Sequence, residues 1–238
     1  MRTAGKIVAE VLNELTNMTK PGVSTWDLDV KAEQIIKNHK AIPTFKGYCG
    51  FPASICASIN DEVVHGIPSK DRILEEGDII SLDVGATYKG MIGDSAITVP
   101  VGEITEDKKL LLQVTNDALM ECIKYCLTTN FLQDVSGVIE DIANNNNLGL
   151  VRNYGGHGIG RKMHEDPFVH NFRTGNKGPK LKKGMTICLE PMFNLGVDEV
   201  YVLEDNWTVV TEDHKSSAHF EHTVHITDNG PEILTLPE

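Results

Sequence analysis

The stretch IISLDVGATYKGMIGDSA at residues 79–96 predicts two β-strands joined by a tight turn, with one aspartate on each strand. If the chain turns back at Tyr88-Lys89, Asp83 lies directly opposite Asp94 on one face, with Cβ atoms about 5 Å apart. Two like charges at that distance repel each other unless a proton or a cation lies between them. A different turn register would separate the carboxylates, so this stretch alone leaves both arrangements open.

Helical patterns flank this hairpin. Apolar side chains recur with the helical period across residues 3–18, and a Lys-Pro-Gly sequence ends that helix. Ser24 followed by Asp27 predicts a capping box for a second helix that runs to about His39. Two more amphipathic helices are predicted at 106–127 and 133–145.

Short strand patterns occupy much of the remaining chain. Segment 41–52 is rich in aromatic residues, glycine and proline, which predicts an irregular loop. Strands are predicted at 54–59, 78–85, 93–101, 148–155, 185–194, 200–205 and 220–227. Helices and antiparallel strands thus recur loosely about residue 110. This pattern predicts an α+β fold in a single domain, 1–238, with two related halves at roughly 1–105 and 106–238.

The composition excludes several classes of protein. The chain has 238 residues, 40% of them hydrophobic, and no apolar tract of the roughly 18 residues that a membrane helix needs. A net charge of −12 argues against a nucleic-acid partner, which requires a basic face. The N-terminal residues do not resemble a signal peptide, and five cysteines without a CxxC pair suit a reducing compartment, so we expect a cytoplasmic protein. Cys122 and Cys126 share an apolar stripe and are predicted to be buried thiols.

Four carboxylates and one imidazole could form a metal site. Glu190 and Glu221 lie in apolar strand patterns, where a charge is costly unless it is paired or bound to a metal. Each alone would suit a strand edge or the surface. Together with Asp83, Asp94 and His157 they form a set that suits two divalent cations. The glycines around His157, in NYGGHGIGRKMHEDP (153–167), would then leave room for ions and substrate beside the ring.

Five blocks, in this order, resemble the type I methionine aminopeptidases of the pita-bread fold. They are VVHGIP (63–68), SLDVGATYKGMIGDSA (81–96), YGGHGIGRKMHEDP (154–167), GMTICLEPMF (184–193) and FEHTVHITDNGPEILT (220–235). The resemblance covers nearly the whole chain. It implies two pseudo-symmetric halves, a curved antiparallel sheet with helices on its outer face, and a dinuclear metal centre.

The resemblance also implies roles for single residues. The metal ligands would be Asp83, Asp94, His157, Glu190 and Glu221, the same set that the carboxylate argument reaches. A metal-activated water would attack the scissile carbonyl, with Glu190 as general base and then acid. His164 would donate to the developing oxyanion, and His65 would hold the scissile amide. The methionine pocket would consist of Phe45, Tyr48, Phe51, Cys56, Met163 and Trp207, although clustered aromatic residues in this loop could equally form local core.

Cofactors and partners follow from the same resemblance. Two divalent ions are expected, and a site rich in oxygen with one histidine suits Co, Mn, Fe or Zn. A monovalent cation near Asn60 and Ser217 is a further expectation from the resemblance. The substrate would be the N-terminal methionine of a nascent chain with a small second residue. We expect a monomer; ribosome contact would be transient, because no added docking module is evident.

Four alternatives stay open at this point. A proline-specific aminopeptidase or prolidase would share the five ligands, and a non-catalytic binding protein would share the fold. A zinc site of His219, His222 and His225 is disfavoured, because alternation along a strand turns the middle histidine away. A phosphate cradle at GGHGIG lacks the residues that such loops carry.

Overall fold

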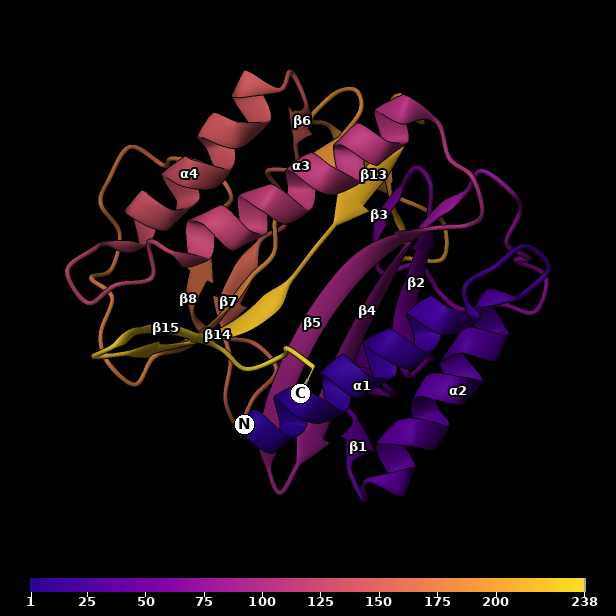
Figure 1. The fold of residues 1–238 in the computed structure, drawn as a ribbon, viewed down its shortest axis with the longest axis horizontal. Helices are drawn as coiled ribbons and strands as arrows, with labels where there is room; N and C mark the ends of the chain where they lie inside the picture. The colour runs from indigo at the N-terminus through magenta and orange to yellow at the C-terminus, as the bar shows by residue number, and fades with distance from the viewer. Residues whose placement is uncertain (238) are drawn as a thin grey trace.

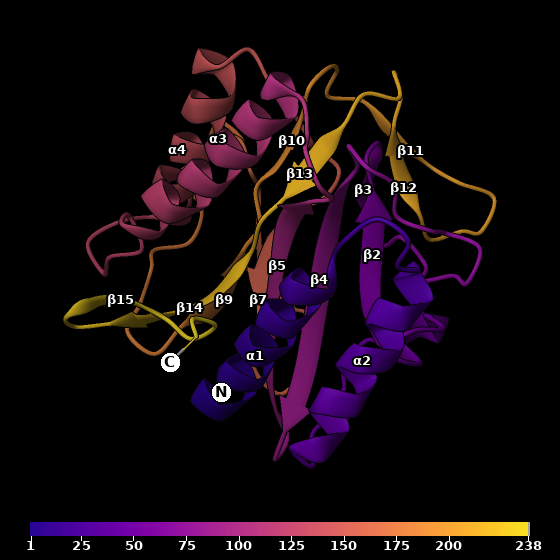
Figure 2. The same cartoon turned by 45° about the vertical axis from the view of Figure 1, so that its right-hand side comes forward.

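The computed structural model describes residues 1–237, and its four helices lie against antiparallel sheets (Figures 1 and 2). The helices are α1 (Arg2–Met18), α2 (Thr25–Asn38), α3 (Glu106–Ile123) and α4 (Leu132–Asn145). Helices α1 and α2 pack on the sheet of the first half, and α3 and α4 pack on strands of the second half. The predicted α+β architecture is confirmed.

Local sequence signals explain where the helices begin. Helix α1 buries one apolar stripe, which includes Val8, Val11 and Leu15. The predicted capping box of α2 is present: the Asp27 amide donates to the Ser24 hydroxyl, and the Ser24 amide donates to the Asp27 carboxylate. These two hydrogen bonds satisfy backbone donors that a helix N-terminus otherwise leaves open.

The third helix is shorter than the sequence predicts, because it ends at Ile123 and not at residue 127. The backbone amides of Tyr125 and Cys126 bond to carbonyls three residues earlier, so the chain tightens into turns there. Cys126 still reaches the core from such a turn, and Cys122 is buried on the helix. The two buried thiols are therefore confirmed, although the apolar stripe outlasts the helix.

A long hairpin forms the centre of the first half. Strands β4 (Ile79–Tyr88) and β5 (Met91–Pro100) are joined by Lys89 and Gly90, which both have positive φ. A two-residue hairpin turn requires such φ values, and glycine accepts them without strain. The turn therefore lies one residue later than predicted, and the predicted register was wrong.

This register moves the two aspartates from opposed to diagonal positions. Asp83 pairs with Ala96, and Asp94 pairs with Gly85. Because the turn shifts by one residue, the pairing shifts by two, and both carboxylates stay on the same face. Diagonal neighbours in an antiparallel pair are about 7–8 Å apart at the backbone, still within reach of one another through a bound ion.

Two breaks separate neighbouring strands: one lies inside the strand predicted at 185–194, and the other falls on the first residues of the strand predicted at 220–227. Residues Glu190 and Pro191 separate β9 (Thr186–Leu189) from β10 (Met192–Asn194), since proline lacks the amide that a strand ladder needs. Glu221 lies between β13 (Ser217–His219) and β14 (His222–Thr227). Its amide donates to the Ala96 carbonyl and its carbonyl accepts from the Ala96 amide, which joins the second half to β5.

The remaining strands are short. They are β1 (Ile42–Pro43), β2 (Ile55–Ile59), β3 (Glu62–Val64), β6 (Gly149–Leu150), β7 (Gly156–Gly158), β8 (Glu165–Val169), β11 (Val200–Val202), β12 (Val209–Thr211) and β15 (Gly230–Ile233). Two predicted strands, at 148–155 and 200–205, are thus reduced to two and three residues. The predicted loop at 41–52 holds only β1 and the short 3-10 turn Tyr48–Gly50.

Two apolar cores support the two sides of the molecule. One joins α1 and α2 to β2 and β4, and the other joins α3 and α4 to the strands of the second half. Ile97 on β5 packs against both cores. The division into halves near residue 105 stays a prediction. Within residues 1–237, no helix combines the length and apolar character needed to span a bilayer.

Candidate metal centre

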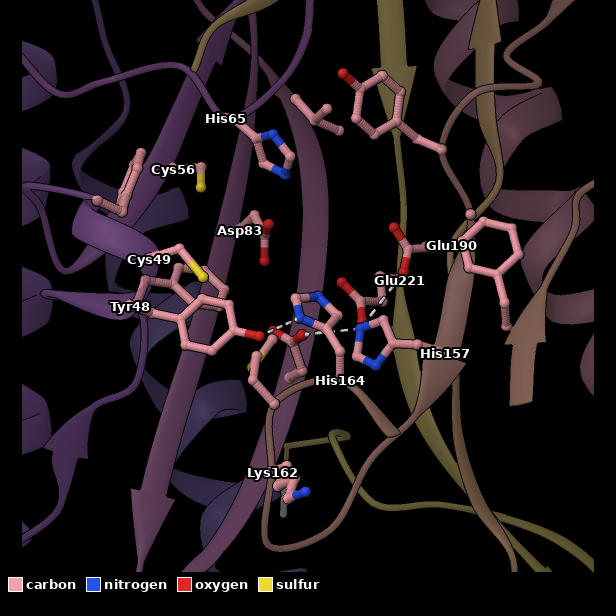
Figure 3. Close-up of a pocket in the computed structure, with 18 of the residues that line it drawn as sticks. Tyr48, Cys49, Cys56, His65, Asp83, His157, Lys162, His164, Glu190 and Glu221 are labelled. Carbon is pink, nitrogen blue, oxygen red and sulfur yellow. Dashed lines mark hydrogen bonds and ion pairs between the residues drawn. The ribbon is translucent and has the colours of Figure 1, made fainter. Parts of the chain in front are cut away.

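A cavity of about 1070 Å³ lies between the two halves (Figure 3). Every site residue that the sequence predicts lines it. These residues are Phe45, Tyr48, Phe51, Cys56, His65, Asp83, Asp94, His157, Met163, His164, Glu190, Trp207 and Glu221. Residues as far apart in the sequence as Phe45 and Glu221 thus meet around one space.

Five different segments supply the carboxylates and the imidazole. Asp83 and Asp94 come from the central hairpin, and His157 comes from β7. Glu190 and Glu221 occupy the two strand breaks. A residue in a break is freed from the alternation of the pleat, so its side chain can turn toward the cavity.

The polar atoms of these groups converge closely. The Nε2 atom of His157 lies 3.8 Å from Oδ2 of Asp94 and 3.7 Å from Oε1 of Glu190. One potential ligand atom from each of Asp94, His157, Cys188 and Glu221 lies within 4.8 Å of the others. These distances are short enough for the groups to share a cation.

Unpaired oxygens show that the group suits a metal. One buried carboxylate oxygen each of Asp83, Asp94 and Glu221 has no hydrogen-bond partner. Buried polar atoms are almost always satisfied, so three such atoms facing one cavity indicate a ligand. Carboxylate oxygens with one imidazole are ligands that first-row divalent metals accept.

The electrostatics of the site point the same way. Burial raises the pKa of Asp83 to about 7. Burial, and then repulsion by neighbouring carboxylates, raises the pKa of Asp94, Glu190 and Glu221. Four carboxyl groups that cannot all ionise comfortably next to one another are stabilised as anions when positive charge lies between them.

His157 is prepared to act as a ligand. Burial lowers its pKa to about 4, so the ring is neutral at pH 7. Its Nδ1 lies 2.9 Å from the Gly158 carbonyl oxygen, and only a protonated Nδ1 can donate to that oxygen. The Nε2 lone pair therefore faces the carboxylates, as metal-binding histidines require.

The glycines around His157 have a different purpose from the one the sequence suggested. A Cβ atom at Gly156 would lie 2.1 Å from the Cys188 carbonyl oxygen, and one at Gly155 would lie 2.5 Å from the Val169 carbonyl oxygen. At Gly158 it would lie 2.2 Å from the Asp166 carbonyl oxygen. These glycines are needed because the backbone of neighbouring strands and loops packs directly against them. The expectation that they make room for ions and substrate was wrong, because backbone fills that room.

Two further histidines flank the carboxylates. The Nδ1 atom of His164 lies 2.8 Å from the Tyr48 hydroxyl, and Figure 3 shows this contact at the cavity wall. Burial lowers the pKa of His65 to about 4. Its φ of 61° is unusual for a residue with a side chain, and such backbone strain concentrates at functional sites.

An apolar wall adjoins the polar groups. Phe45, Phe51, Cys56 and Met163 are buried in one cluster against which Trp207 packs. The Phe51 and Trp207 rings meet edge to face with centroids 5.1 Å apart. Phe45 and Phe51 of the 41–52 loop are thus both core residues and part of the cavity wall. Tyr48 lines the cavity but is 38% exposed, so it does not belong to the core.

The three-histidine zinc site is not formed. The Nδ1 of His222 contacts the Thr235 hydroxyl at 2.8 Å, and the Nδ1 of His225 contacts Glu232 at 3.2 Å. His219 alone of the three lines the cavity. The GGHGIG segment contains strand β7, so it is not the loop that a phosphate cradle needs.

The predicted ligand set leaves out two residues of the site. His219 lies two positions before Glu221 and was considered only as part of the disfavoured zinc site, and Cys188 lies two positions before Glu190. The period of two along a strand is the signal that could have grouped each of them with its neighbouring glutamate.

Comparisons with known proteins agree with this site. A sequence profile of metallopeptidase family M24 matches residues 1–228. A methionine aminopeptidase of Clostridium acetobutylicum is 52% identical over 238 residues, which cover all of this chain and 95% of that protein. The crystal structure of a methionine aminopeptidase from Thermotoga maritima gives a TM-score of 0.97 at 45% identity, covering 99% of this chain and 95% of that chain.

A more distant structure shares the fold alone. The Xaa-Pro dipeptidase from Bacillus anthracis gives a TM-score of 0.77 at 20% identity, covering 99% of this chain and 59% of that chain.

An α+β fold of this kind around buried carboxylates and an imidazole defines a metal-dependent peptidase. The chain belongs to metallopeptidase family M24 and, within it, to the type I methionine aminopeptidases. It is therefore an enzyme, a metal-dependent hydrolase, and the predicted resemblance and pita-bread fold are confirmed.

Proposed function

We propose that this enzyme removes the initiator methionine from nascent proteins and peptides whose second residue is small. The observation that carries the proposal is the convergence of buried, unpaired carboxylate oxygens beside an apolar pocket. The methionine aminopeptidase relatives, similar over nearly their full length, support the choice of substrate. We further propose that the enzyme acts in the cytoplasm, as a monomer, with at most transient ribosome contact and no nucleic acid or membrane partner.

The metal centre would be held by the predicted ligands. Asp83, Asp94, His157, Glu190 and Glu221 would bind two divalent cations of the Co, Mn, Fe or Zn type, whose chemistry when bound is to lower the pKa of water to about 7. The unpaired oxygens support this assignment. A monovalent cation would lie near Asn60 and Ser217, which are joined because the Ser217 amide donates to the Asn60 carbonyl at 2.8 Å.

Glu190 would act as the general base and then as the general acid. Burial, and then the charges of Asp94 and Asp83, raise the pKa of its carboxyl group in the metal-free protein. It would take the proton of the attacking water and deliver it to the leaving amine. The position of Glu190 in a strand break, facing the cavity, supports this role.

His164 would stabilise the oxyanion that develops on the carbonyl. The Tyr48 hydroxyl beside Nδ1 would donate to that atom, which leaves the proton of the neutral ring on Nε2. An Nε2–H directed into the cavity could then donate to the carbonyl oxygen, a contribution of about 2.7–4 kcal/mol to the barrier. His65, which also lines the cavity, would hold the scissile amide.

The pocket would select methionine by shape and polarisability. Met163, Phe51 and Trp207 offer sulfur and aromatic surface, which contact a thioether favourably. Phe45, Tyr48 and Cys56 would complete the wall.

Release of free methionine tests the proposal. We expect hydrolysis of Met-Gly-Met-Met in a series of Co, Mn, Fe and Zn, with no cleavage of Xaa-Pro peptides. Asp94→Ala should abolish activity, whereas the exposed Asp117→Ala should leave it unchanged. Absence of methionine release with every metal would contradict the proposal, and preferential cleavage of Xaa-Pro peptides would favour the prolidase alternative.

A further inference from the structure

His219 is a buried cavity residue with no assigned role. It is only 2% exposed, and its Nε2 atom has no hydrogen-bond partner. The ring lines the cavity, and its Nε2 atom lies 3.8 Å from Oε2 of Glu190. An unsatisfied nitrogen that faces a cavity is costly, so its retention needs a reason.

The backbone of His219 is held rigidly. Its amide donates to the Thr98 hydroxyl and its carbonyl accepts from the same hydroxyl, both at 2.8 Å. Strand β13 also pairs with β10 at this position, opposite Met192. The position of the ring is therefore set by backbone contacts with β5 and β10, and not by a hydrogen bond of its Nε2 atom.

Glu190 lies between two imidazoles. Its Oε1 is 3.7 Å from His157 Nε2, and its Oε2 is 3.8 Å from His219 Nε2. The Asn171 side-chain amide donates to its backbone carbonyl at 3.0 Å, which fixes the main chain but not the carboxylate. The orientation of the Glu190 carboxylate thus depends on the groups that contact each of its two oxygens.

The chemistry of the two facing groups decides which of them donates. A carboxylate oxygen only accepts hydrogen bonds. A favourable contact between the two groups therefore requires the proton on Nε2.

We propose that His219 is a positioning residue, which donates through Nε2–H to Oε2 of Glu190 and holds that carboxylate in place for proton transfer. At 3.8 Å the contact is too long for a hydrogen bond, and it would close when the site is loaded, as catalytic hydrogen bonds often do. This inference rests on the proposed role of Glu190 as general base. His219 itself would not touch the reacting atoms.

Two amide substitutions separate a positioning role from simple packing. In His219→Gln the side-chain amide reaches the place of Nε2, whereas in His219→Asn it reaches only the place of Nδ1. We expect His219→Asn to lower kcat about 10-fold or more with KM changed less than about 2-fold, because a hydrogen bond to a charged group is lost. His219→Gln should stay within about 3-fold of the wild type in kcat. His225→Gln, remote from the cavity and paired with Glu232, is the matched control.

A second measurement does not need activity. The visible absorption spectrum of the cobalt-loaded protein reports the geometry of the ligands, and we expect it to change in His219→Asn but not in His219→Gln or His225→Gln. Equal kcat in the Asn and Gln variants, or a wild-type cobalt spectrum in His219→Asn, would overturn the inference. If the wild type releases no methionine with any metal, the proposed function fails, and the cobalt spectra still decide whether His219 positions Glu190.

Discussion

The Nε2 atom of His157 lies 3.8 Å from Oδ2 of Asp94, and both residues are more than nine-tenths buried. The two groups come from different halves of the chain, on β7 and β5. A neutral imidazole compensates a buried carboxylate only weakly, and Asp94 keeps one oxygen without any partner. The carboxylates at this site therefore repel one another unless a cation or a proton lies between them.

Divalent metal should stabilise the fold. A ligand that binds only the folded state at 100 times its Kd adds about 2.7 kcal/mol to the free energy of unfolding. We expect manganese or cobalt to raise the thermal midpoint of the chelator-treated wild type, measured by circular dichroism. Asp94→Ala should lose most of this increase, and Asp117→Ala should retain it. Equal midpoints with and without metal would contradict the assignment of the site.

The contribution of Asp83 to the stability of the metal-free protein should rise as the pH falls. Burial raises the pKa of Asp83 from 3.8 to about 7, so the folded state holds this proton more tightly than the unfolded state does. The resulting stability is present below about pH 4 and is lost as the pH rises toward and through about 7. Urea unfolding between these values measures the slope, which Asp83→Asn should reduce. An identical slope in the wild type and in Asp83→Asn would refute the burial argument.

The hydrogen bond between Tyr48 and His164 should affect kcat, because it fixes which nitrogen of His164 carries the proton. We expect His164→Ala to lower kcat about 100-fold or more, with little change in KM, because an oxyanion donor is lost. Tyr48→Phe removes only the 2.8 Å hydrogen bond to Nδ1, and it should lower kcat about 2- to 10-fold.

Tyr201→Phe provides the matched control for this pair. Tyr201 contacts His214 at 3.5 Å in an exposed position, so the variant loses the same kind of contact away from the cavity. Steady-state release of methionine measures all three variants. If Tyr48→Phe and Tyr201→Phe have equal kcat, the tautomer argument for His164 is wrong.

The glycine before His157 should tolerate no side chain. In Gly156→Ala the new Cβ would lie 2.1 Å from the Cys188 carbonyl oxygen, so strands β7 and β9 would have to separate. We expect a loss of about 3 kcal/mol in the free energy of unfolding. Gly22→Ala meets open space and suffers only from its positive φ, at a cost of about 1 kcal/mol. Urea unfolding at neutral pH compares them, and equal losses would show that β9 does not crowd this position.

Several features were predictable because they depend on residues close together in the sequence. The Ser24–Asp27 capping box and the apolar stripe of α1 involve contacts within one or two helical turns. The residue types of the site were also readable, since carboxylates in apolar strand patterns need compensation wherever they lie. The resemblance of five ordered blocks then added roles that periodicity alone does not supply.

Other features were settled only when distant segments packed together. The hairpin register depended on the positive φ of Lys89 and Gly90, and a shift of one residue changed which residues face Asp83 and Asp94. The glycines beside His157 looked like space for a substrate until strands and loops from elsewhere were seen to fill it.

The sequence by itself thus determined the helix caps, the fold class and the chemical types of the proposed ligands, because local hydrogen bonds and burial preferences act wherever a residue lies. The tertiary structure alone decided that Glu190 meets His157 on one oxygen and His219 on the other. These approaches join segments far apart in the chain, and their distances depend on how the two halves close around the cavity.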